Sequence, residues 1–361
     1  MKKTIISALV MLLMGVNLTF AQDNQEVKHE SVQYYFFVNN IPSEFNYPLI
    51  GLVNNVNGNH ASIQIGLINS TSGNFGGWQE GLINSVGGNV IGLQDGFINS
   101  VGGNLTGVQN GFINSVGGTV KGIQTGFINA DNGDLMGIQS GFINSVGQSL
   151  YGIQCGFINS ASQIAGIQGG FINSAEGICG LQHGFVNSTK NLCGLQLGFI
   201  NSVDHIEKGL PIGFLSFVKQ GGYKAIEVSY TTTHPINVAF KTGIRQFYTF
   251  PMISWTPDAA DKLWVGYGAG SNLDLTKKLF FNPELLSQHN ISRDFNHYLS
   301  LKANAGFRLS DRFEIVAGPV LAWNVVIDAE DFHQNYTEWN PGIISVNKLS
   351  LGFNAAVRFC F

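Results

Sequence analysis

The chain has 361 residues, more than a single hydrophobic core usually fills, so we expect two structural regions. Charged residues make up only 12% of it, about half the usual share, which predicts a largely uncharged surface. The net charge is −4, and Lys and Arg are scattered rather than clustered. This distribution argues against nucleic acid as a partner.

The N-terminus is typical of a secretory signal peptide. Two lysines follow Met1, an apolar run extends from Ile5 to Val16, and Ala21 precedes the polar Gln22. The run is shorter than the ~20 apolar residues that a membrane-spanning helix needs. We therefore expect a signal peptide over residues 1–21 and a polar linker over 22–35.

From about residue 36 the chain repeats the pattern Gly-x-Gln-x-Gly-x-x-Asn, mostly with a period of 15 residues. A fixed period indicates units that bury their apolar faces against their neighbours. In three later units one residue is lost between the Asn and the next Gly, while the pattern itself is unchanged. The variable part is therefore the turn, and the pattern forms the strands. We expect a β-solenoid over residues 36–210.

A second architecture would use each repeat as one strand of a wide transmembrane barrel, which needs a continuous lipid-facing apolar row. One face of such a strand would carry Gln124, and the other would carry Thr125, whose position holds Glu80, Asp95 or His183 elsewhere. The polar residues on both faces favour the solenoid. We expect amide ladders along its axis, formed by Asn84, Asn99, Asn114, Asn129, Asn144, Asn159, Gln94, Gln109, Gln124 and Gln139. In the alternative, these amides lie on the surface and bind sugar hydroxyls.

The four cysteines are Cys155, Cys179, Cys193 and Cys360. Cys179 and Cys193 occupy the same place in successive repeats, so a solenoid would stack them ~4.8 Å apart. That spacing allows a disulfide, and it equally suits two small apolar residues in a ladder. No Cys or His pair has the spacing of a zinc site, and we expect neither a metal nor another cofactor.

After Asn201 the period decays and alternating apolar and polar residues follow. The last thirteen residues alternate throughout and end on Phe361. This segment resembles the C-terminal strand of bacterial outer-membrane β-barrels, whose terminal aromatic residue is read by the insertion machinery. The resemblance covers about residues 211–361 and implies an antiparallel barrel. Counting the strands between the expected turns, with Pro211–Val218 as the first, gives about eight.

The polar faces of these strands would collect charges of both signs in the barrel lumen. The residues are Glu227, Lys241, Arg245, Glu284, Lys302, Arg308, Glu314 and Arg358. In a small barrel they are expected to pair across the lumen and fill it, because buried charges need partners. The alternative is a selectivity ring in an open pore.

The repeats and the barrel-like tail together resemble a family of bacterial surface-repeat proteins built on Gly-x-Gln-x-Gly-x-x-Asn units. The match spans about residues 51–218. The resemblance implies an envelope location, and it carries over no activity and no functional residue.

No catalytic constellation is evident. The eight His residues lack a Ser or Asp at a recognisable spacing, and the acidic segment Asp328–His333 fits a solvated loop better than a calcium site. We expect a non-enzymatic outer-membrane or cell-surface repeat protein of a diderm bacterium, with a structural or adhesion-type role. Its expected partners are the outer membrane, the barrel-insertion machinery, and a glycan or protein ligand on the repeats. The alternatives are a porin or transport barrel and, less favoured, a lipid- or glycan-active envelope enzyme.

Loop lengths predict a topology for the barrel. If Phe361 ends at the periplasmic rim, the long segments 327–347, 287–296 and 251–262 lie outside. The short turns at 310–312, 276–278 and 233–235 then lie at the periplasmic rim. This assignment treats residues 236–250 as a single strand. Eight strands place the repeats in the periplasm, whereas the family resemblance suggests the surface, so both locations stay open.

Overall fold

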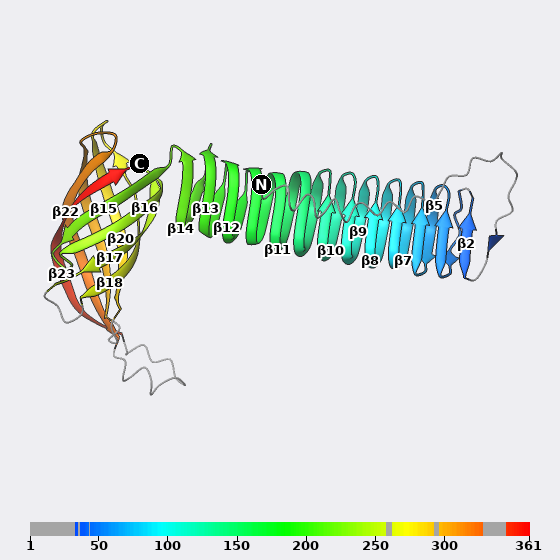
Figure 1. The fold of residues 1–361 in the computed structure, drawn as a ribbon, viewed down its shortest axis with the longest axis horizontal. Coiled ribbons are helices and arrows are strands. Elements are labelled where there is room, and N and C mark those ends of the chain that lie inside the picture. Colours follow the sequence, from blue (N-terminus) through cyan, green and yellow to red (C-terminus); the bar gives the residue numbers. More distant parts are fainter. Residues whose placement is uncertain (1–32, 35–36, 43, 258–261, 292–295, 328–343) are drawn as a thin grey trace. The chain divides into compact units, whose positions relative to one another are not determined.

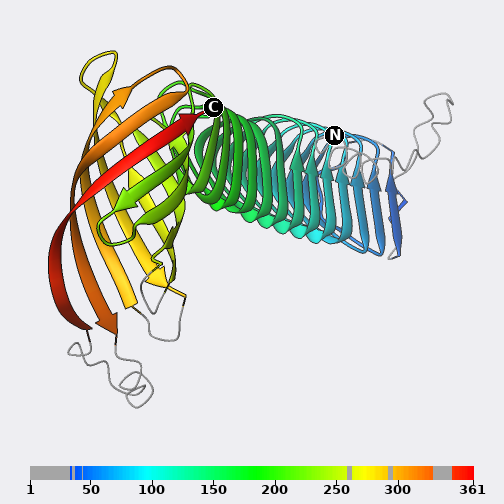
Figure 2. The same cartoon turned by 60° about the vertical axis from the view of Figure 1, so that its left-hand side comes forward.

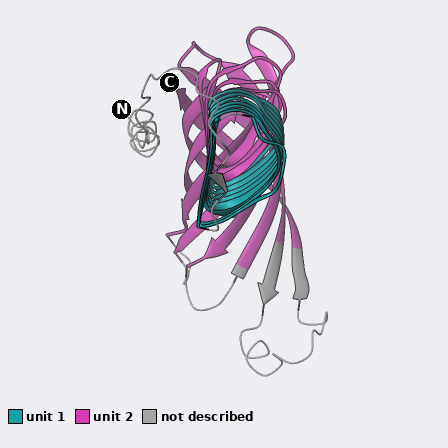
Figure 3. Ribbon diagram, turned by 90° about the vertical axis from the view of Figure 1, so that its right-hand side faces the viewer, with its two compact units in different colours: residues 1–171 teal, residues 172–361 magenta. Residues whose placement is uncertain are grey.

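The computed structural model describes residues 33–34, 37–42, 44–257, 262–291, 296–327 and 344–361. The expected signal peptide, most of the expected linker and the acidic segment Asp328–His333 lie outside these residues. In the part that the structure describes, all regular elements are β-strands (Figure 1; Figure 2). The chain divides into two compact units, residues 1–171 and 172–361 (Figure 3).

The first unit is a stack of parallel coils. Equivalent residues of successive repeats pair directly, as Gln124 does with Gln139 and Asn129 with Asn144. The strands are β2 (Val38–Ile41), β4 (Val53–Val56), β5 (His60–Ile65), β6 (Ile68–Thr71), β7 (Phe75–Val86), β8 (Val90–Val101), β9 (Leu105–Val116), β10 (Val120–Asp131) and β11 (Leu135–Ile178), which continues into the second unit. This parallel pairing confirms the expected β-solenoid and is incompatible with an antiparallel transmembrane meander.

Strand pairing begins within the expected linker. Short strand β1 (Gln33–Tyr34) pairs antiparallel with β2, although residues 22–35 were expected to be a linker. Short strand β3 (Leu49–Ile50) pairs in parallel with β5.

Both amide rows point into the coil. Gln124 and Asn129 are fully buried, together with the apolar Val120. In a straight strand two residues five positions apart lie on opposite faces. Both are buried here because the alternation of buried and exposed residues breaks between them, around Gly126, which has no side chain.

The second unit contains three more coils, followed by the barrel. Strands β12 (Leu181–Leu192), β13 (Leu195–Ile206) and β14 (Leu210–Gln220) are parallel, with β13 between the other two. Residues 211–218 were expected to be the first barrel strand and residue 211 the start of the barrel. Both expectations are wrong, because this segment is the last strand of the parallel stack and the barrel begins at Tyr223.

The barrel is antiparallel and closed. Its strands are β15 (Tyr223–Thr231), β16 (Ile236–Ile244), β17 (Phe247–Trp255), β18 (Leu263–Gly270), β20 (Leu279–Asn290), β21 (Asn296–Arg308), β22 (Phe313–Ile327) and β23 (Ile344–Cys360), with the short β19 (Leu273–Asp274) beside β20. Pairing of β15 with β23 and of β18 with β20 closes the ring. The expected number of eight is confirmed, but a hairpin, β16 and β17, replaces the single strand expected over 236–250.

The first and last barrel strands meet at one rim. Ala225 pairs with Cys360, and the backbone N–H of Phe361 donates to the carbonyl oxygen of Lys224 at 3.1 Å. Because β15 runs away from this rim, the turn at 233–235 lies at the opposite one. It was expected at the Phe361 rim, and the extra hairpin accounts for the error.

Candidate functional site

A charged cluster occupies the middle of the barrel lumen. The guanidinium of Arg358 contacts Glu227 at 2.5 Å and Glu284 at 2.8 Å. Lys241 contacts Glu227 at 2.8 Å and also contacts Glu284. All four side chains are at most 1% exposed. Two cations and two carboxylates therefore neutralise one another, as burial of charge requires.

Neutral polar side chains extend this cluster along the lumen. The hydroxyl of Tyr248 donates to Glu284 at 2.6 Å, and Arg358 also donates to the side-chain oxygen of Asn282 at 2.7 Å. Lys302 joins through Asn354, its ammonium lying 3.5 Å from the amide oxygen. These tyrosine and asparagine partners were not anticipated, although each lies at an inward-facing position of an alternating strand.

A second charged group lies near the Phe361 rim. Arg245 contacts Glu314 at 2.8 Å, and Arg308 lies 3.6 Å from the same carboxylate. Arg308 and Asp274 also form an ion pair. The eight expected lumen charges thus separate into a fully buried centre and a partly exposed rim group, which Asp274 joins.

Apolar side chains fill the lumen around the charges. Tyr248, Phe250, Met252 and Leu286 are buried and belong to one cluster. The ammonium of Lys241 lies 4.4 Å from the ring centre of Phe250. The lumen is therefore packed with side chains in the way a protein core is.

The outer wall of the barrel is apolar. Leu351 is 80% exposed, and large apolar side chains are exposed around the ring, namely Ile226, Val228, Ile253, Leu285, Leu301, Ile315, Phe353 and Val357. Aromatic rings gather towards the Phe361 rim. The ring centre of Phe359 lies 6.1 Å from that of Phe361 and 5.4 Å from that of Phe313. The alternation that buries Arg358 thus exposes its neighbours Val357 and Phe359.

The amide ladders lie inside the solenoid. All ten expected Asn and Gln residues are fully buried. The amide of Asn114 donates to the side-chain oxygen of Asn129 in the next coil at 2.8 Å, whereas Gln124 donates to Gln109 in the preceding coil at 2.8 Å. The two ladders therefore run in opposite directions along the axis. Buried amides cannot bind sugar hydroxyls, so that alternative is wrong.

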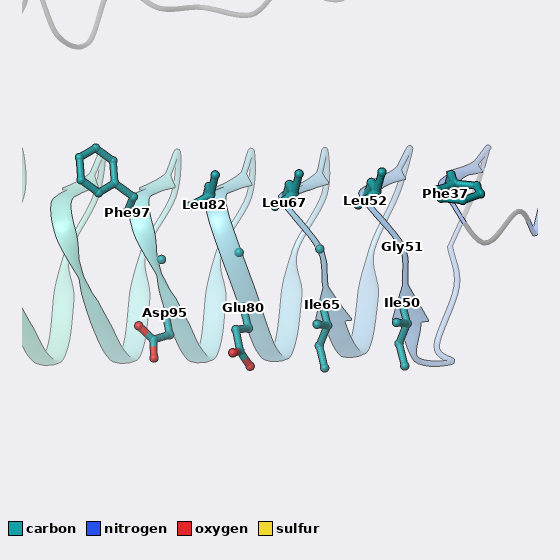
Figure 4. A pocket seen from close by; sticks show the side chains of 13 residues that line it. Phe37, Ile50, Gly51, Leu52, Ile65, Leu67, Glu80, Leu82, Asp95 and Phe97 are labelled. Atoms are coloured by element: carbon teal, nitrogen blue, oxygen red, sulfur yellow. The ribbon is translucent and has the colours of Figure 1, made fainter.

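Aromatic and apolar rows cover the outside of the coils. Phe97, Phe112, Phe127, Phe142 and Phe157 stack at 4.9 Å with nearly parallel rings. Over the first coils this row consists mainly of leucines. A groove of ≈ 640 Å³ lies there between the leucines and the row that contains Glu80 and Asp95 (Figure 4). Glycines of successive repeats line the groove between the two rows. A ligand of the repeats would meet these rows rather than the amides.

The cysteines are free thiols. Cys179 is exposed, and a hydrogen bond with Cys193 raises the pKa of the Cys179 thiol. The two sulfurs therefore lie next to each other without a bond between them. Among the residues that the structure describes, no group of three His, Cys, Asp or Glu side chains is arranged to hold a metal ion.

The fold defines an all-β protein in which a parallel β-solenoid precedes a closed eight-stranded antiparallel barrel. No protein-family model, curated protein or solved structure matches the chain. The described residues include no helix long and apolar enough to cross a membrane.

Proposed function

We propose that this protein is a non-enzymatic component of the bacterial outer membrane, anchored by its barrel and carrying the repeats as a structural or adhesion-type element. The observation that carries the proposal is the reversed polarity of the barrel. Apolar side chains such as Leu351 face outwards, and charges such as Arg358 are buried inside. Water would favour the opposite arrangement, whereas lipid favours this one.

Two features of the sequence support the same location. The N-terminal residues are typical of a signal peptide, which would export the chain. The final strand ends on Phe361, in keeping with its resemblance to strands read by the barrel-insertion machinery. The family resemblance of the repeats also suggests the cell envelope.

The packed lumen argues against a porin. Arg358, Lys241, Glu227 and Glu284 neutralise one another in its middle, and Phe250 packs against them. In an open pore these charged side chains would instead face a water-filled channel. We expect the barrel to act as an anchor.

The strand order favours a periplasmic location for the repeats. The chain enters the barrel at the rim that holds Phe361, and short turns at 245–246 and 309–312 lie at the same rim. Outer-membrane barrels usually have short turns on the periplasmic side and longer loops outside. The surface location implied by the family resemblance is the competing possibility.

The anchor is tested by expression and cell fractionation. We expect the protein in the outer-membrane fraction, with a faster-migrating folded form on unheated gels and no discrete conductance steps in planar bilayers. Recovery in the soluble periplasmic fraction would contradict the anchor, and stepwise conductance would support the porin.

The side of the outer membrane on which the repeats lie is tested with Lys121→Cys in a background that lacks the native cysteines. We expect an impermeant thiol reagent to label this exposed site in lysed cells and not in intact ones. Labelling of intact cells would place the repeats outside and refute the periplasmic orientation.

A further inference from the structure

The last coil rests on the outer wall of the barrel. Thr249 and Tyr267 each donate a hydrogen bond from the side-chain hydroxyl to the carbonyl oxygen of Gly213 at 2.7 Å. The backbone N–H of Ser216 donates to the hydroxyl of Thr242 at 3.2 Å. The inward neighbours Lys241 and Tyr248 are buried in the lumen, so Thr242 and Thr249 face outwards. A strand of the solenoid therefore occupies wall that would otherwise meet lipid.

The direction of β14 shows which of its residues lie farther from the Phe361 rim of the barrel. Thr242 and Thr249 lie close to the ends of β16 and β17 at the Phe361 rim. After its contacts there, β14 ends at Gln220 and the chain enters the barrel at the same rim. The residues before Gly213, including Ile212, therefore lie on the side of these contacts away from the rim.

The coils next to the barrel are amphipathic in the matching direction. In β13, Leu195 and Leu197 are partly exposed and Phe199 is exposed, whereas Asp204 and Glu207 at the other end of the coil are exposed and charged. The position of Leu197 is Ile212 in the next coil. In the middle coils of the first unit the same position is polar, as shown by Glu80, Asp95, Asn110 and Thr125, whereas the first coils have Ile50 and Ile65 there.

An aromatic ladder joins this apolar face to the barrel wall. Phe185 and Phe199 stack at 4.9 Å, Phe199 and Phe214 at 4.7 Å, and Phe214 and Tyr267 of the barrel at 4.9 Å. Tyr267 belongs to strand β18, so the row of rings passes from coil to barrel without a gap. Aromatic rings are the side chains that barrels place at the membrane interface.

We infer that coils β13 and β14 form a lipid-contacting surface, which rests on the membrane beside the barrel through Leu195, Leu197, Phe199, Ile212 and Phe214. The partner is the lipid surface itself. Burial of these side chains among acyl chains and headgroups removes apolar area from water, while Asp204 and Glu207 stay hydrated. The inference rests on the proposed membrane anchor.

Three single-cysteine variants of the full chain, made without the native cysteines, test the inference. Leu197→Cys probes the apolar face, Asp204→Cys the charged end of the same coil, and Leu351→Cys the barrel belt. Each is labelled with bimane and reconstituted into phosphatidylcholine vesicles that contain nitroxide-labelled lipid. We expect the label at position 197 to be quenched nearly as much as that at 351, and the label at 204 to stay bright.

The outcomes separate the two proposals. Quenching at 351 with equal brightness at 197 and 204 would refute the lipid-contacting surface and leave the anchor intact. No quenching at 351 in folded protein would refute the anchor itself. If Leu197→Cys does not fold, Phe199→Cys reports on the same face, with the same two readings.

Discussion

The side-chain amide of Asn114 donates a hydrogen bond to the backbone carbonyl of Thr125 at 2.8 Å, eleven residues ahead in the next coil. Its second hydrogen bond goes to Asn129. The same pair of bonds recurs at Asn84, Asn99 and Asn129. The motif asparagine thus satisfies a carbonyl beside the motif glycine, and so both residues recur together.

Replacement of Asn114 and Asn129 by Leu should lower the melting temperature of the repeats. Each buried group left without a partner costs about 1–3 kcal/mol. Thr125→Ala is the matched control, because the Thr125 hydroxyl bonds only to an exposed neighbour, Asn110. Equal melting shifts by circular dichroism in the two cases would contradict the role assigned to the asparagines.

Gly122→Ala should disrupt the stack. Gly122 has a φ of +148°, and an added Cβ would lie 1.8 Å from the carbonyl oxygen of Gly107 in the preceding coil. Neither the conformation nor the contact can relax without separating the strands. Gly169→Ala is the control, since its Cβ would meet only the Cys155 sulfur at 3.9 Å. Limited proteolysis should cleave the Gly122 variant faster, and similar rates for the two would contradict this account.

Asp131 should make the repeats less stable as pH rises. It takes the place of Val116 and Val146 in the neighbouring coils, and burial raises its pKa from 3.8 to about 8. The folded state keeps a proton that the unfolded chain loses, so stability falls between about pH 4 and 8 and is constant above.

The variants Asp131→Val and Asp131→Asn should both flatten this part of the stability profile, because neither side chain ionises. Urea denaturation at several pH values measures the effect. An unchanged slope in both variants would show that another group is responsible.

His60, at the start of the solenoid, should make the repeats less stable as pH falls. Its ring is buried between Phe45 and Phe75, and desolvation lowers the pKa of the imidazole. The unfolded chain therefore takes up a proton first, and stability decreases as pH falls below about 6.5. His60→Phe should remove this acid sensitivity, as measured by melting curves between about pH 7 and pH 5, where histidine titrates. A variant that keeps the sensitivity would contradict the assignment.

Arg358→Met should destabilise the barrel strongly. It leaves Glu227 and Glu284 in direct contact with one cation, Lys241, and breaking a buried ion pair costs about 3–5 kcal/mol. Arg312→Met, in an exposed turn, is the control. The loss of the fast-migrating folded form with increasing urea in detergent micelles measures the difference. Equal midpoints would show that the lumen charges do not hold the barrel closed.

The sequence by itself determined the two architectures. The recurrence of Gln124 and Asn129 at equivalent positions predicted parallel coils, because a coil of fixed length places identical residues above one another. The alternation around Arg358 predicted a strand with one charged and one apolar face. Both signals are local, since each follows from the spacing of residues along a short stretch of backbone.

Only the tertiary structure decided which strands pair. Pro211–Val218 joined the solenoid because β13 supplied an unpaired parallel edge, and the chain turned at Arg245–Gln246 to complete the eight-stranded ring. Likewise, Arg358 meets Glu227, 131 residues away, only when the ring closes. Such contacts depend on the packing of distant segments, which the spacing of neighbouring residues does not encode.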